Sequence, residues 1–115
     1  MGLSITIPRW NIEEETGYHP ITTFWQDFSI ADKFGKRAIS DTYNRAFAEW
    51  KGNYKYLTEL VMVLNHKCWA HYIPCGSDDE NAFSMLYTKL YYKAHDYACR
   101  HLKGDELSYY TRITD

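Results

Sequence analysis

The sequence contains few cysteines, and they follow neither a disulfide nor a metal-binding pattern. Its 115 residues include only Cys68, Cys75 and Cys99, and none of them lies in a CxxC pair. An odd, dispersed set argues against the disulfide framework that small secreted domains carry. We therefore expect a protein of the reducing cytoplasm.

Long apolar runs and an excess of one charge are also missing. No stretch approaches the roughly 18 apolar residues of a membrane span, and the N-terminus lacks the basic and apolar segments of an export signal. The net charge is -2, from 13 basic and 15 acidic side chains. This balance lacks the basic surplus of a duplex-binding domain. We expect a soluble, unexported domain with neither a membrane nor a nucleic acid as its partner.

Common catalytic motifs are absent as well. The sequence has no P-loop, no glycine-rich dinucleotide turn, no GxSxG elbow and no HExxH pair. No glutamate is followed by a histidine three residues later, which excludes the di-iron signature of helical bundles. We expect a non-enzymatic protein without a cofactor.

Aromatic side chains, in contrast, are abundant. The chain has 11 Tyr, 5 Phe and 4 Trp, which together make 17% of its residues. Aromatic residues at this density can fill the single core that a chain of this length builds. Tyr and Trp also favour interfaces, because each joins an apolar body to a polar tip. Core filling and an additional binding role are both open.

Apolar residues at helical spacing predict an all-α domain, with three long antiparallel helices in a bundle and a short leading helix. Ser29 and Asp32 resemble a capping box that opens the first segment. Gly35 divides this segment into the short helix and the first long helix. Its apolar stripe consists of Ala31, Phe34, Ala38, Thr42, Ala46 and Trp50.

The second and third long helices have clear start signals. Asn53 is a typical N-cap for a helix over about 54–72. Ser77 and Glu80 form a capping box for a helix that ends at Gly104.

The second long helix has an unusually wide apolar arc. Met62, Val63 and Trp69 extend its main stripe, which indicates neighbours on two sides. The residues predicted on its polar face are Lys55, Glu59 and His66.

Both ends of the chain alternate apolar and polar residues. Residues 1–21 alternate from Leu3 to Ile7 before becoming acidic, and we interpret them as a strap or short strand outside a helical domain of residues 22–115. The tail could be a strand, paired with residues 3–7, or a frayed extension. Its alternating residues are Leu107, Tyr109, Thr111 and Ile113.

Two pairs of metal-binding residue types occur at helical spacing. Cys68 and His71 are three residues apart, and His95 and Cys99 are four apart. In a hairpin that turns near Cys75, His71 and His95 would lie some 20 Å from each other along the axis. The two pairs therefore cannot form one four-ligand site within a chain, and we predict no metal.

The dipeptide His95-Asp96 resembles the metal-binding dipeptide of helical His-Asp phosphohydrolases. Those enzymes need an upstream histidine on a facing helix, whereas His66 falls on the predicted polar face and His71 is distant. A metal-dependent hydrolase of this type stays an alternative.

A helix-turn-helix is the second alternative that the sequence raises. Ile30, Ala31 and Gly35 have the spacing of its first half. The positions that should bury the second helix hold Asp41 and Asn44, which argues against DNA binding. The local contacts would be Lys36, Arg37 and Arg45.

The third long helix carries a second apolar ridge opposite its main stripe. Met85, Tyr92 and Cys99 fall seven residues apart, among polar neighbours. The N-terminal strap, the tail or another copy of the chain could cover this ridge. It is our candidate binding surface.

Three stretches of the sequence, TFWQDFSIADKFG, DTYNRAFAEWKGNYKYLTELVMVLNHK and LKGDELSYYTRITD, resemble a family of short proteins of unknown function from gut anaerobes and their phages or mobile elements. The resemblance covers about four fifths of the chain and assigns no catalytic residue. It implies an intracellular accessory protein that acts by binding. We expect a protein-protein interaction module or homo-oligomer, with a nucleotide-like small-ligand binder as the alternative.

Overall fold

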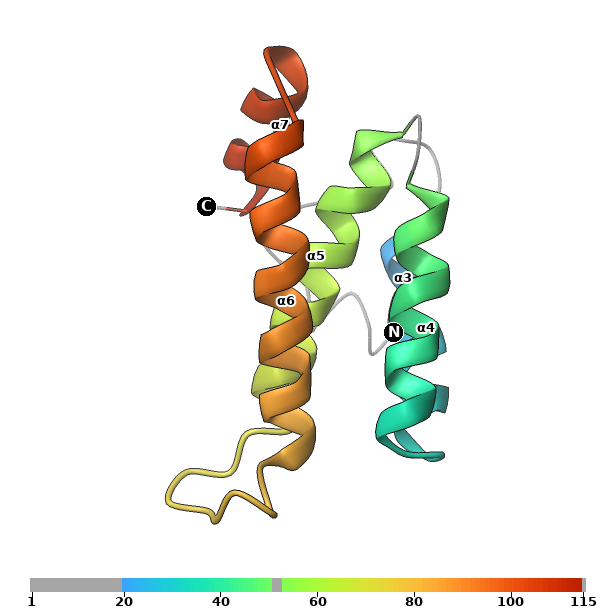
Figure 1. Cartoon of the computed structure of the whole chain (residues 1–115), viewed down its shortest axis with the longest axis vertical. Coiled ribbons are helices and arrows are strands. Elements are labelled where there is room, and N and C mark those ends of the chain that lie inside the picture. The colour runs from blue at the N-terminus through green and yellow to red at the C-terminus, as the bar shows by residue number, and fades with distance from the viewer. Residues whose placement is uncertain (1–19, 51–52, 115) are drawn as a thin grey trace.

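A computed structural model of the chain describes residues 20–50 and 53–114, and these residues are all-helical, as the apolar spacing predicts. The predicted strap over residues 1–21 lies outside the described part, apart from its last two residues, which begin a helix. Among the described residues, no helix combines the length and apolar character that crossing a bilayer demands. The helices, labelled in Figure 1, are α3 (Pro20–Asp32), α4 (Lys36–Glu49), α5 (Tyr54–Ala70), α6 (Ala82–His101) and α7 (Asp105–Thr114).

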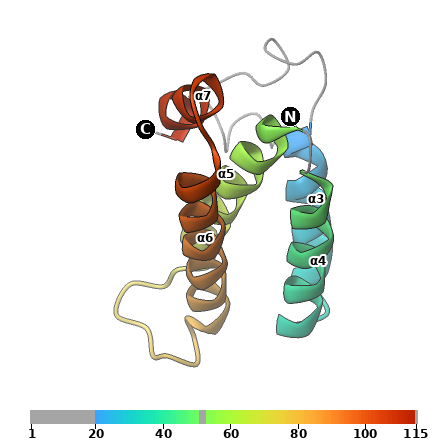
Figure 2. The same cartoon turned by 45° about the horizontal axis from the view of Figure 1, so that its top comes forward.

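Helix α5 is the centre of the fold. It contacts each of the other four helices, and every side chain over residues 57–64 is buried. Figure 2 shows α3 and α4 as one pair beside α5 and α6, with α7 at one end of α6. The wide apolar arc of α5 thus has the neighbours that it predicts.

Part of the predicted polar face of α5 is buried by the neighbouring helices. Glu59, which the periodicity places opposite the main stripe, has an exposed fraction of 0%. Over residues 57–64, where neighbouring helices cover it, α5 has no solvent face. The positions that would be polar on a surface helix are therefore buried here.

The predicted capping box at Ser29 and Asp32 is wrong. Helix α3 begins at Pro20, whose ring suits the first turn of a helix, and it ends at Asp32. Phe24, Phe28 and Ala31 are buried along its length. This stripe extends the helix upstream, so Ser29 lies inside it. The turn predicted at Gly35 does separate α3 from α4.

The predicted Asn53 cap forms, and the predicted hydrogen bonds between Ser77 and Glu80 form in the turn before α6, whose N-cap is Asn81. The Asn53 side chain accepts a hydrogen bond from the Lys55 backbone amide, 3.1 Å away. The Ser77 amide donates to Glu80 Oε1 (2.8 Å), and the Glu80 amide donates to Ser77 Oγ (3.2 Å). Helix α6 begins at Ala82, shortly after this reciprocal pair.

The extended or frayed tail that the alternation predicts is also wrong, because residues 105–114 form helix α7. Asp105 and Glu106 occupy its first turn, where negative charge favours a helix. Tyr109, Tyr110 and Ile113 are buried at helical spacing. Burial of this stripe against α5 and α6 outweighs the alternating pattern. Five helices, rather than three long ones and a short leader, make up the described bundle.

Gly35 gives a test of the α3–α4 turn. Its φ of 113° and ψ of -174° fall in a region that is essentially restricted to glycine, although a Cβ there would meet no atom within 4 Å. We expect Gly35→Ala to lower the free energy of unfolding by about 1–3 kcal/mol through backbone strain. Gly104→Ala, at a φ of 57° with equally open space, is the control with a smaller cost. Equal costs in urea unfolding would contradict this account.

Candidate functional site

The α5–α6 hairpin carries an open groove with a volume of about 700 Å³. Four large apolar side chains that the fold leaves exposed line it, namely Trp69, Tyr72, Met85 and Tyr92. The other residues that line the groove are Asn65, Cys68, Asp78, Asn81, Ser84, Thr88, Lys89 and Tyr91.

Helical spacing on both helices produces this groove. On α5, Asn65, Cys68 and Trp69 fall at positions i, i+3 and i+4, so they share one face, and Tyr72 follows just beyond the end of the helix at Ala70. The two helices are joined below the groove by a hydrogen bond from Ser84 Oγ to the Cys68 carbonyl oxygen, 2.7 Å long. The groove is therefore built on a fixed helix pair.

The aromatic rings of the groove are arranged in edge-to-face pairs. Trp69 packs against Tyr72 with ring centroids 5.6 Å apart, and Tyr91 packs against Tyr92 at 5.0 Å. Burial raises the pKa of the Cys68 thiol, which keeps it protonated at neutral pH. The groove thus offers aromatic surface and no activated nucleophile.

The structure separates the three residues of the predicted ridge. Met85 and Tyr92 both line the groove, with exposed fractions of 53% and 57%. Cys99 is exposed too, but it lies beyond the groove, near α7. The buried Tyr109 and Tyr110 of α7 are not among the residues that line the groove.

Two side chains that the apolar pattern places in the core are exposed to solvent. Trp69 is 65% exposed and Phe34 is 78% exposed. Trp69 follows Asn65 by four residues and precedes Tyr72 by three. This spacing indicates a second stripe on one side of α5 and its C-terminal end.

A second notable cluster surrounds Asp32 at the end of α3. Its Oδ2 atom accepts hydrogen bonds from Lys67 Nζ (2.7 Å) and pairs with His71 Nε2 (3.0 Å). Its Oδ1 atom accepts a 2.5 Å bond from the Tyr87 hydroxyl. Lys67 also donates to Ser29 Oγ at 3.0 Å. One carboxylate thereby connects α3 to α5 and α6.

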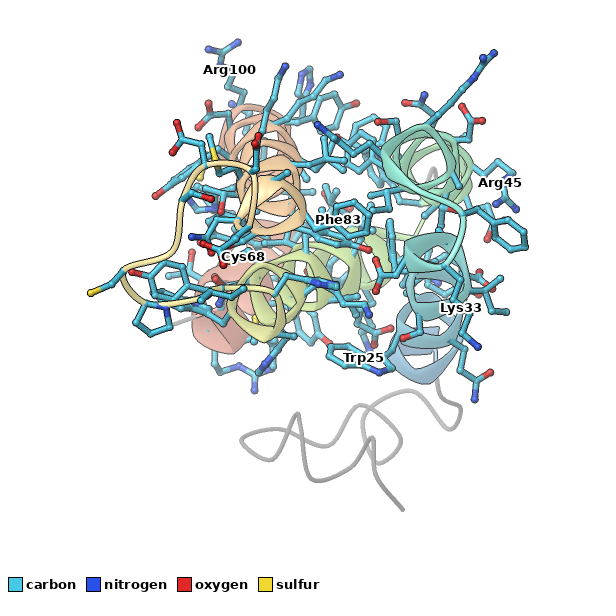
Figure 3. All side chains as sticks on the ribbon, turned by 90° about the horizontal axis from the view of Figure 1, so that it is seen from below. Trp25, Lys33, Arg45, Cys68, Phe83 and Arg100 are labelled. Atoms are coloured by element: carbon cyan, nitrogen blue, oxygen red, sulfur yellow. The ribbon has the colours of Figure 1, made fainter. Side chains whose placement is uncertain are left out.

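Aromatic rings enclose this cluster. The Lys67 ammonium lies 4.6 Å from the centre of the Trp25 ring, and the His71 ring stacks on Tyr87 and meets the edge of Phe83. Figure 3 shows Phe83 extending from α6 toward the interior, whereas Arg100 of the same helix projects outward. Burial, with the adjacent Asp32, raises the pKa of Tyr87, so its hydroxyl remains a donor. The Asp32 carboxylate, the Lys67 ammonium and the Tyr87 hydroxyl all have partners, which is typical of a structural tie.

A third cluster lies on α6 next to α7. His95 Nδ1 is 2.6 Å from the Tyr110 hydroxyl oxygen, and its Nε2 is 3.7 Å from Cys99 Sγ. The His95 ring stacks between Tyr91 and Tyr110, at 5.8 Å from each. This packing fixes the orientation of the imidazole.

The two Cys and His pairs named above occupy different parts of the molecule. His71 contacts Asp32, and Cys68 donates to the Asn65 carbonyl oxygen, whereas His95 contacts Tyr110. Across residues 20–50 and 53–114, no three His, Cys, Asp or Glu side chains are placed to hold one metal ion within a chain. The basic residues of the helix-turn-helix alternative, Lys36, Arg37 and Arg45, are exposed on α4.

Comparisons with known proteins give no further assignment. No protein-family model, no curated protein and no solved structure matches the chain.

Proposed function

We propose that this protein is a non-enzymatic interaction module that binds an amphipathic helix of a partner protein in the α5–α6 groove. The observation that carries the proposal is the gathering of Trp69, Tyr72, Met85 and Tyr92 in one groove, each 47% exposed or more. Tyr and Trp are the side chains that most often dominate binding energy at interfaces. Large exposed apolar patches usually mark such surfaces.

The dimensions of the groove favour a helix as its occupant. On α6, residues 85–92 span about 10 Å at the helical rise, which is two turns of a docked helix. The facing wall runs from Asn65 of α5 to Tyr72, two residues beyond the end of α5. A partner helix that lies between α5 and α6 would insert apolar residues at i, i+3 or i+4, and i+7. The ordinary packing of three helices would then cover the exposed rings.

The charges of the groove specify the flanks of this helix. Lys89 lies on one wall, while Asp78 lies at the loop that precedes α6, beside Asp79 and Glu80. A partner helix with an acidic flank toward Lys89 and a basic end toward this loop matches both charges. A nucleotide fits less well, because Lys89 is the one basic side chain among the described residues that line the groove.

A photo-crosslinking amino acid at position 92 tests the proposal in cells. We expect crosslinks to one partner protein, on the apolar face of a helical segment. Trp69→Ala should then weaken the affinity of the purified segment at least tenfold, because it removes a central aromatic anchor.

The matched control uses Phe34, the exposed apolar residue of the α3–α4 turn. The crosslinker at position 34 should give no crosslink to that partner, and Phe34→Ala should leave the affinity unchanged. Crosslinks from position 92 to residues 1–19 of the same chain, or to no protein, would overturn the proposal.

The resemblance to short proteins of phages and mobile elements supports the same proposal. Small helical proteins in that context often act by binding host components.

A further inference from the structure

We propose that His95 and Cys99 from two copies of this chain together bind one Zn²⁺ in a Cys₂His₂ site, which joins the copies as a dimer. The proposal does not depend on the groove, because neither residue lines it. It concerns the cluster of His95, Cys99 and Tyr110, which has no part in the proposed binding of a partner helix.

The spacing of the two ligand atoms is that of a zinc site. In tetrahedral coordination, with zinc about 2.3 Å from sulfur and 2.0–2.1 Å from nitrogen, the sulfur and nitrogen ligands lie about 3.6 Å apart. Cys99 Sγ and His95 Nε2 are 3.7 Å apart. Their i, i+4 relation on α6 places both on one helix face. The pair therefore needs little rearrangement to hold the ion.

The second nitrogen of His95 already has the partner that a zinc ligand requires. Histidines that bind metals usually donate their other ring N–H to a fixed acceptor, which sets the tautomer. Here the Tyr110 hydroxyl oxygen lies 2.6 Å from Nδ1. A phenol oxygen can accept this bond. Nε2 is left facing Cys99.

Within one chain, the described residues do not complete the coordination sphere. Structural zinc sites take four protein ligands, and the described residues bring no third His, Cys, Asp or Glu to this place. A two-fold axis beside α6 would bring a second, identical pair, because the same patch serves both partners of a symmetric dimer. Cys99 is exposed, so a second copy can approach it. Two thiols then lose one proton each to solvent as their sulfurs bind the ion.

Cys99 lies seven residues beyond Tyr92, or about 10 Å along α6, so the zinc site would lie beside the groove and not in it.

Zinc titration of the purified protein, in reducing buffer with a phosphine reductant, tests this inference. Light scattering should show a doubling of mass that is complete at one Zn²⁺ for two chains. Native mass spectrometry should show the same stoichiometry. With Co²⁺ in place of zinc, a thiolate-to-metal charge-transfer band should appear.

Three variants assign the ligands. Cys99→Ser and His95→Gln should abolish the dimer and the charge-transfer band, while Cys75→Ser, which changes the other exposed cysteine, should alter neither. Cys99 is on the surface, so its variant should keep the circular dichroism of the parent chain even if replacing His95 disturbs α7. Absence of zinc binding, one zinc per monomer, or a zinc dimer that survives Cys99→Ser would overturn the inference.

Discussion

Asp32→Ala is expected to lower the free energy of unfolding by about 3–5 kcal/mol, the cost of removing one partner from a buried ion pair. Lys67 has an exposed side-chain fraction of only 5%, and its ammonium pairs with Asp32 at 2.7 Å. Without the carboxylate, a buried positive charge would retain only Ser29 Oγ and the Trp25 ring. The Tyr87 hydroxyl would lose its nearer acceptor and retain the Phe28 carbonyl oxygen, 3.4 Å away. Urea unfolding followed by circular dichroism measures the loss.

Asp27→Ala is the matched control. Asp27 lies on the same helix and is exposed, so its replacement should change the free energy of unfolding by no more than about 0.5 kcal/mol. Adding Lys67→Met to Asp32→Ala should recover part of the lost stability, because the stranded charge disappears. A loss below about 1 kcal/mol for Asp32→Ala would show that the cluster is not a structural tie.

The stability of the protein should fall as the pH rises through the neutral range because of Glu59. This side chain is fully buried, and neither of its carboxyl oxygens has a hydrogen-bond partner in the described part of the chain. Burial raises its pKa from 4.5 to about 9, against a smaller opposing effect of Lys55. The folded protein therefore binds a proton that the unfolded chain releases above pH 4.5. This contribution to stability is complete below pH 4.5 and is lost as the pH rises toward 9.

The size of this effect follows from the linkage between proton binding and folding. Each pH unit between the two pKa values changes the free energy of unfolding by about 1.4 kcal/mol, so the interval from pH 5 to pH 8 is worth about 4 kcal/mol. Glu59→Met removes the ionisable group and keeps a straight apolar side chain. The variant should be more stable than the parent at pH 8, with a flatter dependence on pH.

Glu49→Met, at an exposed position of α4, controls for the loss of one carboxylate. Its dependence on pH should follow that of the parent chain. Parallel curves for Glu59→Met and the parent would contradict a buried neutral acid at this position.

Local signals predicted the hydrogen bonds near helix starts well where these bonds depend on a few neighbouring residues. The Asn53 cap and the pair Ser77 and Glu80 form within three residues of sequence, so the sequence is enough to find them. Ser29 and Asp32 have the same local pattern, but their partners on α5 lie 35–39 positions away. The structure at Ser29 and Asp32 depends on the apolar stripe upstream and on these distant contacts. A pattern of four neighbouring residues contains no information on either.

The groove was predicted in part for a similar reason. The seven-residue spacing of Met85 and Tyr92 identified the wall that α6 provides. Trp69 on α5 was assigned to the core, because apolar residues on two faces of one helix look alike until the neighbours are known. Glu59 shows the converse, since a charged residue predicts a solvent face even where other helices cover it.

The Asp32 cluster also bears on the order in which the bundle assembles. Lys67, His71 and Tyr87 come from α5, its C-terminal end and α6, which form one hairpin, whereas the carboxylate comes from α3. Contacts close in sequence form earlier in folding than distant ones. We therefore expect the α5–α6 hairpin to form first, with three side chains that converge on the position of the Asp32 carboxylate. When α3 packs against the hairpin, this carboxylate pairs with them and joins the two halves of the bundle.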